Sequence, residues 1–251
     1  MRVTKSLLEF LITACINDYG GEYGKVKKIF DNTERFDVEN VEGYFGYLIS
    51  EPHTLYIVFR GTDEGFDWKQ NFKFRKLPVV KMTNGIDEMH VPYSDINPKI
   101  RVHRGFSIDY KKVRKKILEK CKDGTYNTII VTGHSKGGAE ATLAAVDIQY
   151  NFPKRKVINV PFASPKVGNK YFVESYNKRV PKTLRVVNAE DYITKVPLGI
   201  QGYKHVGTLL RIGKRNPICW IPVIRAFGSF YHYPSKGYLK NIKKLPEDYS
   251  F

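Results

Sequence analysis

The stretch from Thr128 to Val146 constrains the fold more than any other part of the sequence. It begins with the β-branched run Thr-Ile-Ile-Val-Thr, continues as Gly-His-Ser-Lys-Gly-Gly and ends in an alanine-rich segment. A strand that passes through G-x-S-x-G directly into a helix must turn sharply, and the glycines around Ser135 let the strand and the helix approach closely. The pattern therefore predicts a strained strand-to-helix turn that holds Ser135 above a sheet.

The same turn gives Ser135 a chemical role. The start of the following helix places backbone N–H groups and the positive end of the helix dipole beside the serine, where they stabilise a developing oxyanion. A serine hydroxyl becomes a good nucleophile when an imidazole accepts its proton and a carboxylate orients that imidazole. The pentapeptide alone is a weak signal, and its alternative interpretation is an inert turn, but the flanking strand and helix patterns favour a nucleophile.

Strand and helix patterns alternate along most of the chain. The strand patterns cover 44–49, 54–60, 100–103, 128–132, 157–162, 183–187 and 205–212, and the helical patterns cover 107–122, 136–150, 169–179 and 238–244. This alternation predicts an α/β fold with a mostly parallel central sheet flanked by helices, and Pro52-His53 predicts a hairpin between the first two strands. Because no repeat or linker interrupts the sequence, we expect residues 1–251 to form a single domain.

Four segments resemble the class 3 lipase family, and they do so in the family's order. They are Tyr56–Thr62, Val102–Phe106, Gly133–Gly138 and Val186–Asp191. The resemblance extends over roughly residues 40 to 235, and four ordered motifs make coincidence improbable. It implies the α/β-hydrolase fold and a lipase or a related ester hydrolase.

The resemblance also assigns roles to individual residues. It makes Ser135 the nucleophile, Asp191 the orienting acid, and the backbone N–H groups of Thr62 and Lys136 the oxyanion hole. Asp191 follows a strand pattern and should emerge at the same edge of the sheet as Ser135. The alternatives are a helix cap or turn residue for Asp191 and a strand-ending turn residue for Thr62. Lys136 departs from the apolar residue typical of the family, which affects the shape of the pocket but not the backbone donor.

The general base must be one of the histidines. In this fold the chain order is serine, acid and then histidine, which leaves His205 and His232. His134 should point away from the nucleophile, towards the sheet. The resemblance matches His205 to a strand position and His232 to the loop that carries the family's base, although Tyr231 stands where the family often has an acidic residue. We therefore expect His232 to be the base.

Together these residues predict a serine carboxylester hydrolase that acts on lipid-like esters, of the triacylglycerol lipase or phospholipase A type. The reaction would proceed through an acyl-enzyme, with no metal and no cofactor. The alternatives are an esterase or thioesterase of soluble substrates, and a membrane-surface binding protein that is catalytically inactive. Residues 76–99 are apolar for a loop of their length and are a candidate lid; the alternative is a packed surface loop.

The formal net charge of +17 favours an anionic partner. The densest basic run, 111–120, also carries apolar residues at helical spacing, as expected of a solvated helix that packs on the core. No nucleic-acid motif accompanies the charge, so we expect no nucleic-acid partner and consider an anionic membrane surface as a partner besides the substrate. The sequence does not predict an oligomeric state.

The first residues of the sequence resemble a targeting signal. A basic start precedes an apolar stretch, and Ile12-Thr13-Ala14-Cys15 looks like a lipoprotein cleavage box. Glu9 interrupts the stretch, however, and Leu7, Leu11 and Cys15 recur at helical spacing. We therefore expect an amphipathic helix and a cytoplasmic protein; the alternative is a lipoprotein or secreted protein that uses residues 1–15.

Overall fold

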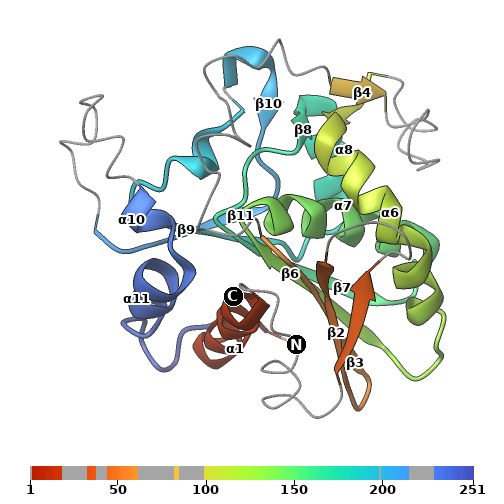
Figure 1. Ribbon diagram of the computed structural model, residues 1–251, viewed down its shortest axis with the longest axis horizontal. Helices are drawn as coiled ribbons and strands as arrows, with labels where there is room; N and C mark the ends of the chain where they lie inside the picture. Colours follow the sequence, from red (N-terminus) through yellow and green to blue (C-terminus); the bar gives the residue numbers. More distant parts are fainter. Residues whose placement is uncertain are drawn as a thin grey trace.

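The computed structural model describes residues 2–18, 33–37, 44–61, 82–84, 99–197, 199–214 and 229–251. Its centre is a seven-stranded sheet in the order β1-β2-β3-β6-β7-β9-β11 (Figure 1). The strands β1 to β3 pair antiparallel, and β3, β6, β7, β9 and β11 pair parallel. The strands are β1 (Thr33–Asp37), β2 (Tyr44–Glu51), β3 (Thr54–Phe59), β6 (Thr128–His134), β7 (Lys156–Phe162), β9 (Leu184–Asn188) and β11 (Thr208–Ile212). The expected α/β class with a mostly parallel sheet is confirmed.

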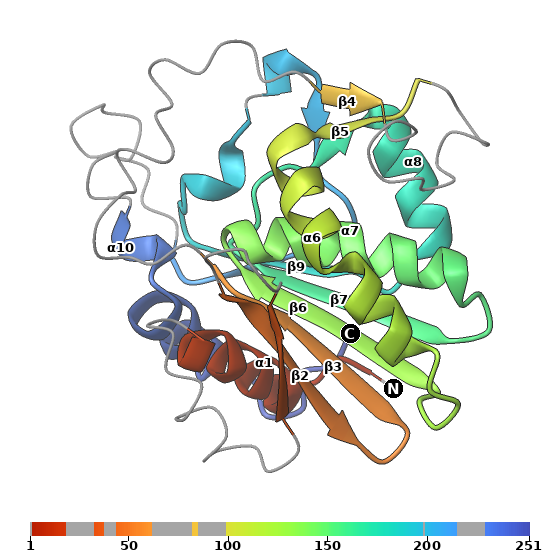
Figure 2. The ribbon, with the colours of Figure 1, turned by 45° about the vertical axis from the view of Figure 1, so that its right-hand side comes forward.

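Helices cover both faces of this sheet (Figure 2). The helices α6 (Arg104–Cys121), α7 (Lys136–Asn151) and α8 (Lys170–Arg179) pack on one face. The other face is covered by α1 (Lys5–Asp18), the π-helix η4 (Pro234–Leu239) and α11 (Lys240–Ile242). The central strands β3 and β6 are buried almost throughout, which explains why they read as continuous apolar runs and not as alternating ones.

A second, smaller sheet accompanies the central one. Its order is β10-β8-β5-β4, with β4 (Met82–Asn84), β5 (Arg101–His103), β8 (Gly168–Asn169) and β10 (Tyr203–Lys204). Short helical turns, η1 (Ile193–Lys195), η2 (Gly199–Gln201) and α10 (Ser229–His232), complete the described chain. The expected strand over 205–212 is therefore wrong at its start, because β10 ends at Lys204 and Gly207, at φ +64°, turns the chain before β11 begins.

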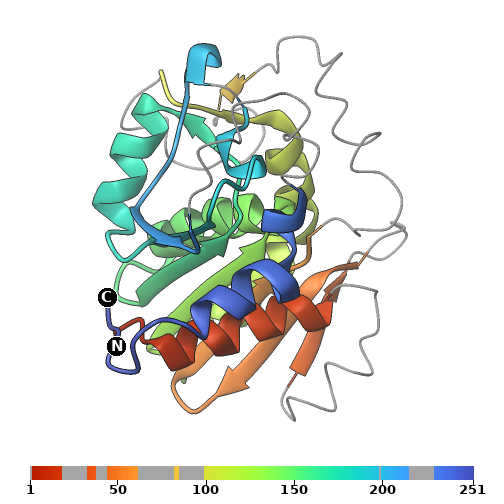
Figure 3. The same ribbon diagram turned by 90° about the vertical axis from the view of Figure 1, so that its left-hand side faces the viewer.

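The two ends of the described chain lie side by side (Figure 3). The backbone of Val3 exchanges hydrogen bonds with that of Phe251, at 3.0 and 2.9 Å. The expected first helix is present as α1, and Leu8, Leu11, Ala14 and Cys15 on it are buried in the core between the sheet and η4. Within the described ranges, no helix is both long enough and apolar enough to cross a membrane.

Candidate active site

Ser135 lies at the sharp turn between β6 and α7. Its φ and ψ angles are 59° and −124°, a strained combination for a residue that carries a side chain. The flanking glycines are required by space. A Cβ atom on Gly133 would lie 2.4 Å from the Gly137 carbonyl, and one on Gly137 would lie 2.3 Å from the carbonyl oxygen of Phe59. The sequence therefore produces the strained turn that the motif predicts.

The serine side chain is buried, but its hydroxyl forms no hydrogen bond with a described residue. Ser135 is fully buried, and its backbone N–H donates to the carbonyl of Phe162 on β7, at 3.0 Å. Its Oγ has no hydrogen-bond partner among the described residues. A buried hydroxyl without a partner costs free energy, so a site that keeps one open is arranged for a reacting group and not for stability.

Asp191 and His232 form a hydrogen-bonded pair beside this turn. The Nδ1 atom of His232 donates to Asp191, at 3.0 Å from Oδ1 and 2.9 Å from Oδ2. Asp191 is fully buried after β9, and the backbone N–H of Ile193 donates to its Oδ1 at 3.0 Å. With Nδ1 carrying the proton, Nε2 of the neutral ring is the acceptor, which is the tautomer a general base needs.

The backbone that carries His232 differs from the expectation. The sequence predicts a loop at this position, whereas His232 is the last residue of the short helix α10. Its side chain is 6% exposed, and Asn188 Nδ2 anchors the preceding carbonyl, that of Tyr231, at 2.8 Å. The base is therefore held by the end of β9 as well as by Asp191.

His134 was expected to point away from the site, and this is only partly right. Its ring is buried next to the His232 ring, with 4.6 Å between the centroids, and next to Tyr238 at 5.4 Å. Burial, followed by the electrostatic effect of the neighbouring His232, lowers the pKa of His134 well below its usual value. His134 is thus a neutral ring that packs against the base.

Tyr238 is a site residue that the sequence does not predict. Its Oη donates to Asp191 Oδ2 at 2.6 Å, and the residue is fully buried. Burial and the charge of Asp191 raise the pKa of Tyr238 well above its usual value, so it remains a donor. The only signal in the sequence is its position within a helical pattern after His232, which marks many core tyrosines equally well.

Of the two expected oxyanion donors, the structure describes only Lys136. Thr62 lies outside the described residues, directly after Gly61. Lys136 is the first residue of α7, so its backbone N–H has no acceptor within the helix. Its side chain is turned towards α6, because Nζ bonds Asp109 Oδ2 at 2.8 Å and Glu140 Oε1 at 3.2 Å. This explains how a lysine replaces an apolar residue here: its charge is neutralised away from the turn.

Two sequence candidates remain, the second late histidine, His205, and the candidate lid. His205 Nε2 bonds the carbonyl of Thr194 at 2.6 Å and has no bond to Asp191, and burial lowers its pKa to about 3. Of the candidate lid, 76–99, the structure describes only Met82–Asn84 and Lys99; the rest lies outside the described residues.

A strained serine after a buried parallel strand, with a buried acid-histidine pair at the same sheet edge, defines the class as the α/β-hydrolases. Within it, residues 56–200 match the family described as Lipase (class 3). This match covers more than half of the chain, so the chain belongs to the class 3 lipase family.

Individual relatives agree with this family. A chloroplastic phospholipase A(1) of Arabidopsis thaliana is 35% identical over 153 residues, which are 56% of this chain and 33% of that protein. A secreted mono- and diacylglycerol lipase of Malassezia globosa is 31% identical over 134 residues, or 51% and 44% of the two chains. The structure of the Rhizomucor miehei triacylglyceride lipase superimposes with a TM-score of 0.65 at 20% identity, covering 82% of this chain and 79% of that one. The chain thus spans less than half the length of either curated relative.

Proposed function

We propose that the protein is a serine carboxylester hydrolase that acts on lipid-like esters, of the triacylglycerol lipase or phospholipase A type. The observation that carries the proposal is the bond between His232 Nδ1 and the buried Asp191, at the sheet edge where Ser135 is held in its strained turn. No simple structural role accounts for a buried acid, a base and an unpartnered hydroxyl gathered there.

The proposed mechanism has two halves. Ser135 Oγ attacks the ester carbonyl carbon while His232 Nε2 accepts its proton, and His232 then returns that proton to the leaving alcohol. A water molecule next gives a proton to His232 and attacks the acyl carbon. His232 then passes that proton to Ser135 Oγ as the bond between Oγ and the acyl group breaks, which releases the fatty acid and restores the serine. Asp191 holds the imidazole and stabilises its charged form. The backbone N–H groups of Lys136 and Thr62 would bind the oxyanion in both halves.

Labelling with a fluorophosphonate probe tests the nucleophile, because only an activated serine reacts. We expect mass spectrometry to place the adduct on Ser135, with no adduct in the His232→Ala variant. An unlabelled wild-type protein would instead support the inactive membrane-binding alternative.

A substrate panel tests the lipid class. Triacylglycerol, phospholipid, a short soluble ester and a thioester should be offered in monomeric and aggregated form. We expect the highest kcat/KM on aggregated lipid ester. A preference for the monomeric short ester or for the thioester would support the soluble-substrate alternative.

Two further proposals concern the chain as a whole. We propose that residues 1–15 stay with the folded domain, because Leu8, Leu11 and Cys15 are buried. We also propose that the protein acts in the cytoplasm as one domain over 1–251. Mass spectrometry of the protein isolated from its own cells should then find these residues intact. The candidate lid over 76–99 stays a prediction, as does docking on an anionic membrane.

A further inference from the structure

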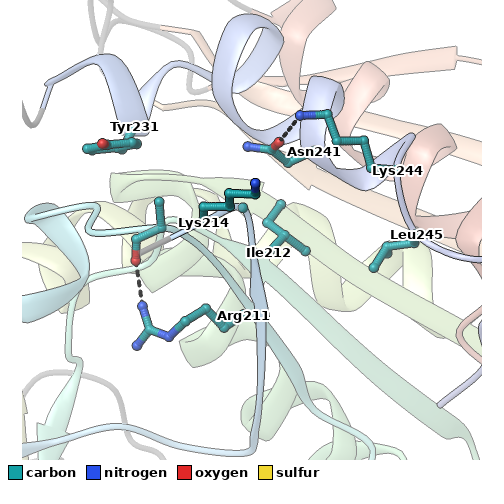
Figure 4. A pocket seen from close by; sticks show the side chains of 9 residues that line it. Arg211, Ile212, Lys214, Tyr231, Asn241, Lys244 and Leu245 are labelled. Atoms are coloured by element: carbon teal, nitrogen blue, oxygen red, sulfur yellow. Dashed lines mark hydrogen bonds between the residues drawn. The ribbon is translucent and has the colours of Figure 1, made fainter. Parts of the chain in front are cut away.

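A pocket of about 530 Å³ opens where β11 ends, between that strand and α11 (Figure 4). Arg211, Ile212 and Lys214 line it from the strand side, and Asn241 and Lys244 line it from the helix side. The catalytic mechanism uses none of these residues.

The pocket is strongly cationic. Arg211, Lys214 and Lys244 supply its charges, and it has no acidic lining residue. Lys244 donates to Asn241 Oδ1 at 3.0 Å and Arg211 donates to the Ala189 carbonyl, so both bond neutral oxygens. None of these cations forms an ion pair with a described residue. Like charges around one cavity repel each other, and an anion bound among them would offset that repulsion.

A buried arginine strengthens this positive field. Arg185, on the neighbouring strand β9, is 9% exposed, and its Nε has no hydrogen-bond partner among the described residues. Burial, followed by the positive charge of Arg211, lowers the pKa of Arg185 to about 10. Arg185 thus adds a second positive charge close to that of Arg211.

A chain of side-chain amides fixes the pocket relative to the base. Asn241 Nδ2 donates to Asn188 Oδ1, and Asn188 Nδ2 donates to the Tyr231 carbonyl, each at 2.8 Å. Gly213, at φ +73°, lets the backbone pass over this chain, since a Cβ there would lie 2.6 Å from Asn188 Oδ1. Lys214 follows directly, so its position depends on the same contact.

From these observations we infer that the pocket binds a phosphate group. A phosphate offers several oxygens to donors that approach from different sides, whereas a carboxylate offers only two. Ile212 and Leu245 give the pocket an apolar wall that suits the organic part of a phosphate ester. The phosphate comes either from a lipid headgroup or from free phosphate. The inference stands apart from the proposed hydrolysis, because binding does not need an active serine.

Calorimetry on the full chain with Ser135→Ala tests this inference without hydrolysis. The ligands are inorganic phosphate, monomeric dihexanoylphosphatidic acid and, as a carboxylate control, hexanoate, all at one ionic strength. We expect both phosphate compounds to bind and to compete, and hexanoate to bind at least about tenfold more weakly. Tighter binding of the lipid than of inorganic phosphate assigns the site to a headgroup, and equal binding assigns it to free phosphate.

The matched variants are Lys214→Gln with Lys244→Gln in the pocket, and Lys111→Gln on α6 with Lys122→Gln directly after it. Both pairs remove the same charge from exposed positions. The pocket pair should weaken phosphate binding at least about tenfold, and the α6 pair less than about twofold. Equal weakening by both pairs, equal binding of hexanoate, or absence of phosphate binding would overturn the inference.

Discussion

Tyr238 Oη donates a hydrogen bond of 2.6 Å to Oδ2 of Asp191, the same carboxylate that accepts from His232. The tyrosine therefore restricts the position of the acid that orients the base. We expect Tyr238→Phe to lower kcat about tenfold with little change in KM, because about 1.4 kcal/mol of orientation would be lost from the transition state alone. Steady-state kinetics measure this.

A matched control separates positioning from stability. Tyr126 lies between α6 and β6 and donates to Ser50 Oγ at 2.9 Å. It precedes β6, whereas Ser135 follows the other end of that strand. Tyr126→Phe should cost similar stability, about 1 kcal/mol, and leave kcat unchanged. If both variants lower kcat alike, Tyr238 has only a structural role.

Substitutions at Ser135 should separate activity from stability. Ser135→Ala should reduce ester hydrolysis by at least about a thousandfold and keep the fold, because only the oxyanion donors and binding remain. Ser135→Gly should be equally inactive yet about 1 kcal/mol more stable, since glycine adopts positive φ without strain. Activity assays and thermal unfolding measure the two effects. A Ser135→Ala protein with more than about a tenth of the activity rules out the assignment.

The two late histidines should respond differently to alanine. His232→Ala should abolish hydrolysis with a modest change in Tm. His205→Ala should lower Tm and reduce activity only in part, because its ring anchors the Thr194 carbonyl at 2.6 Å. Parallel rate and melting measurements distinguish the residues, and the reverse pattern would transfer the role of base to His205.

Glu140 gives a prediction for stability against pH. Burial raises the pKa of Glu140 from 4.5 to about 7, despite the nearby charge of Lys136. Because the folded protein holds the proton more tightly than the unfolded chain, this contribution is complete below pH 4.5 and is lost as the pH rises through about 7. It amounts to about 3 kcal/mol.

Glu140→Gln should flatten the free energy of unfolding between these pH values, as denaturant titrations at several pH values would show. The control is Glu119→Gln, an exposed position on α6 whose removal should keep the wild-type slope. An unchanged slope in Glu140→Gln would mean that the carboxylate is ionised throughout and neutralised by Lys136.

The basic excess predicts how salt acts on membrane docking. If the charge of +17 brings the protein to anionic lipid, vesicle binding should weaken as the Debye length falls from about 30 Å at 0.01 M to about 8 Å at 0.15 M salt. Hydrolysis of a soluble ester should barely change. Co-sedimentation with neutral and anionic vesicles measures the binding, and a result independent of salt and lipid charge would leave the basic surface as solvation.

The sequence predicted the fold well because local patterns and the central sheet agree. The run before Ser135 forms β6, which is buried on both faces. The segment after it forms α7, whose small residues let the helix pack closely on the sheet. The strand over Thr33–Asp37 was not predicted, because all of its residues except Phe36 are polar or charged and its pairing with β2 is a property of the edge of the sheet.

Less of the candidate site than of the fold could be predicted from the sequence. The motif located Ser135, and chain order narrowed the base to two histidines. The contact between His134 and His232, however, depends on where the last segment of the chain crosses the sheet. The same is true of Tyr238, whose π-helical turn carries its hydroxyl to Asp191. Such contacts join distant segments, and no local periodicity encodes them.

The pairing of the two ends of the described chain has a consequence for biosynthesis. The helix α1 shares its face of the sheet with η4 and α11, and these residues leave the ribosome more than two hundred positions after α1. Until then α1 lacks these two partners, whereas the residues of the turn at Ser135 have already emerged. A nascent chain should therefore contain a formed nucleophile without a base, so that catalysis begins as the last step of folding.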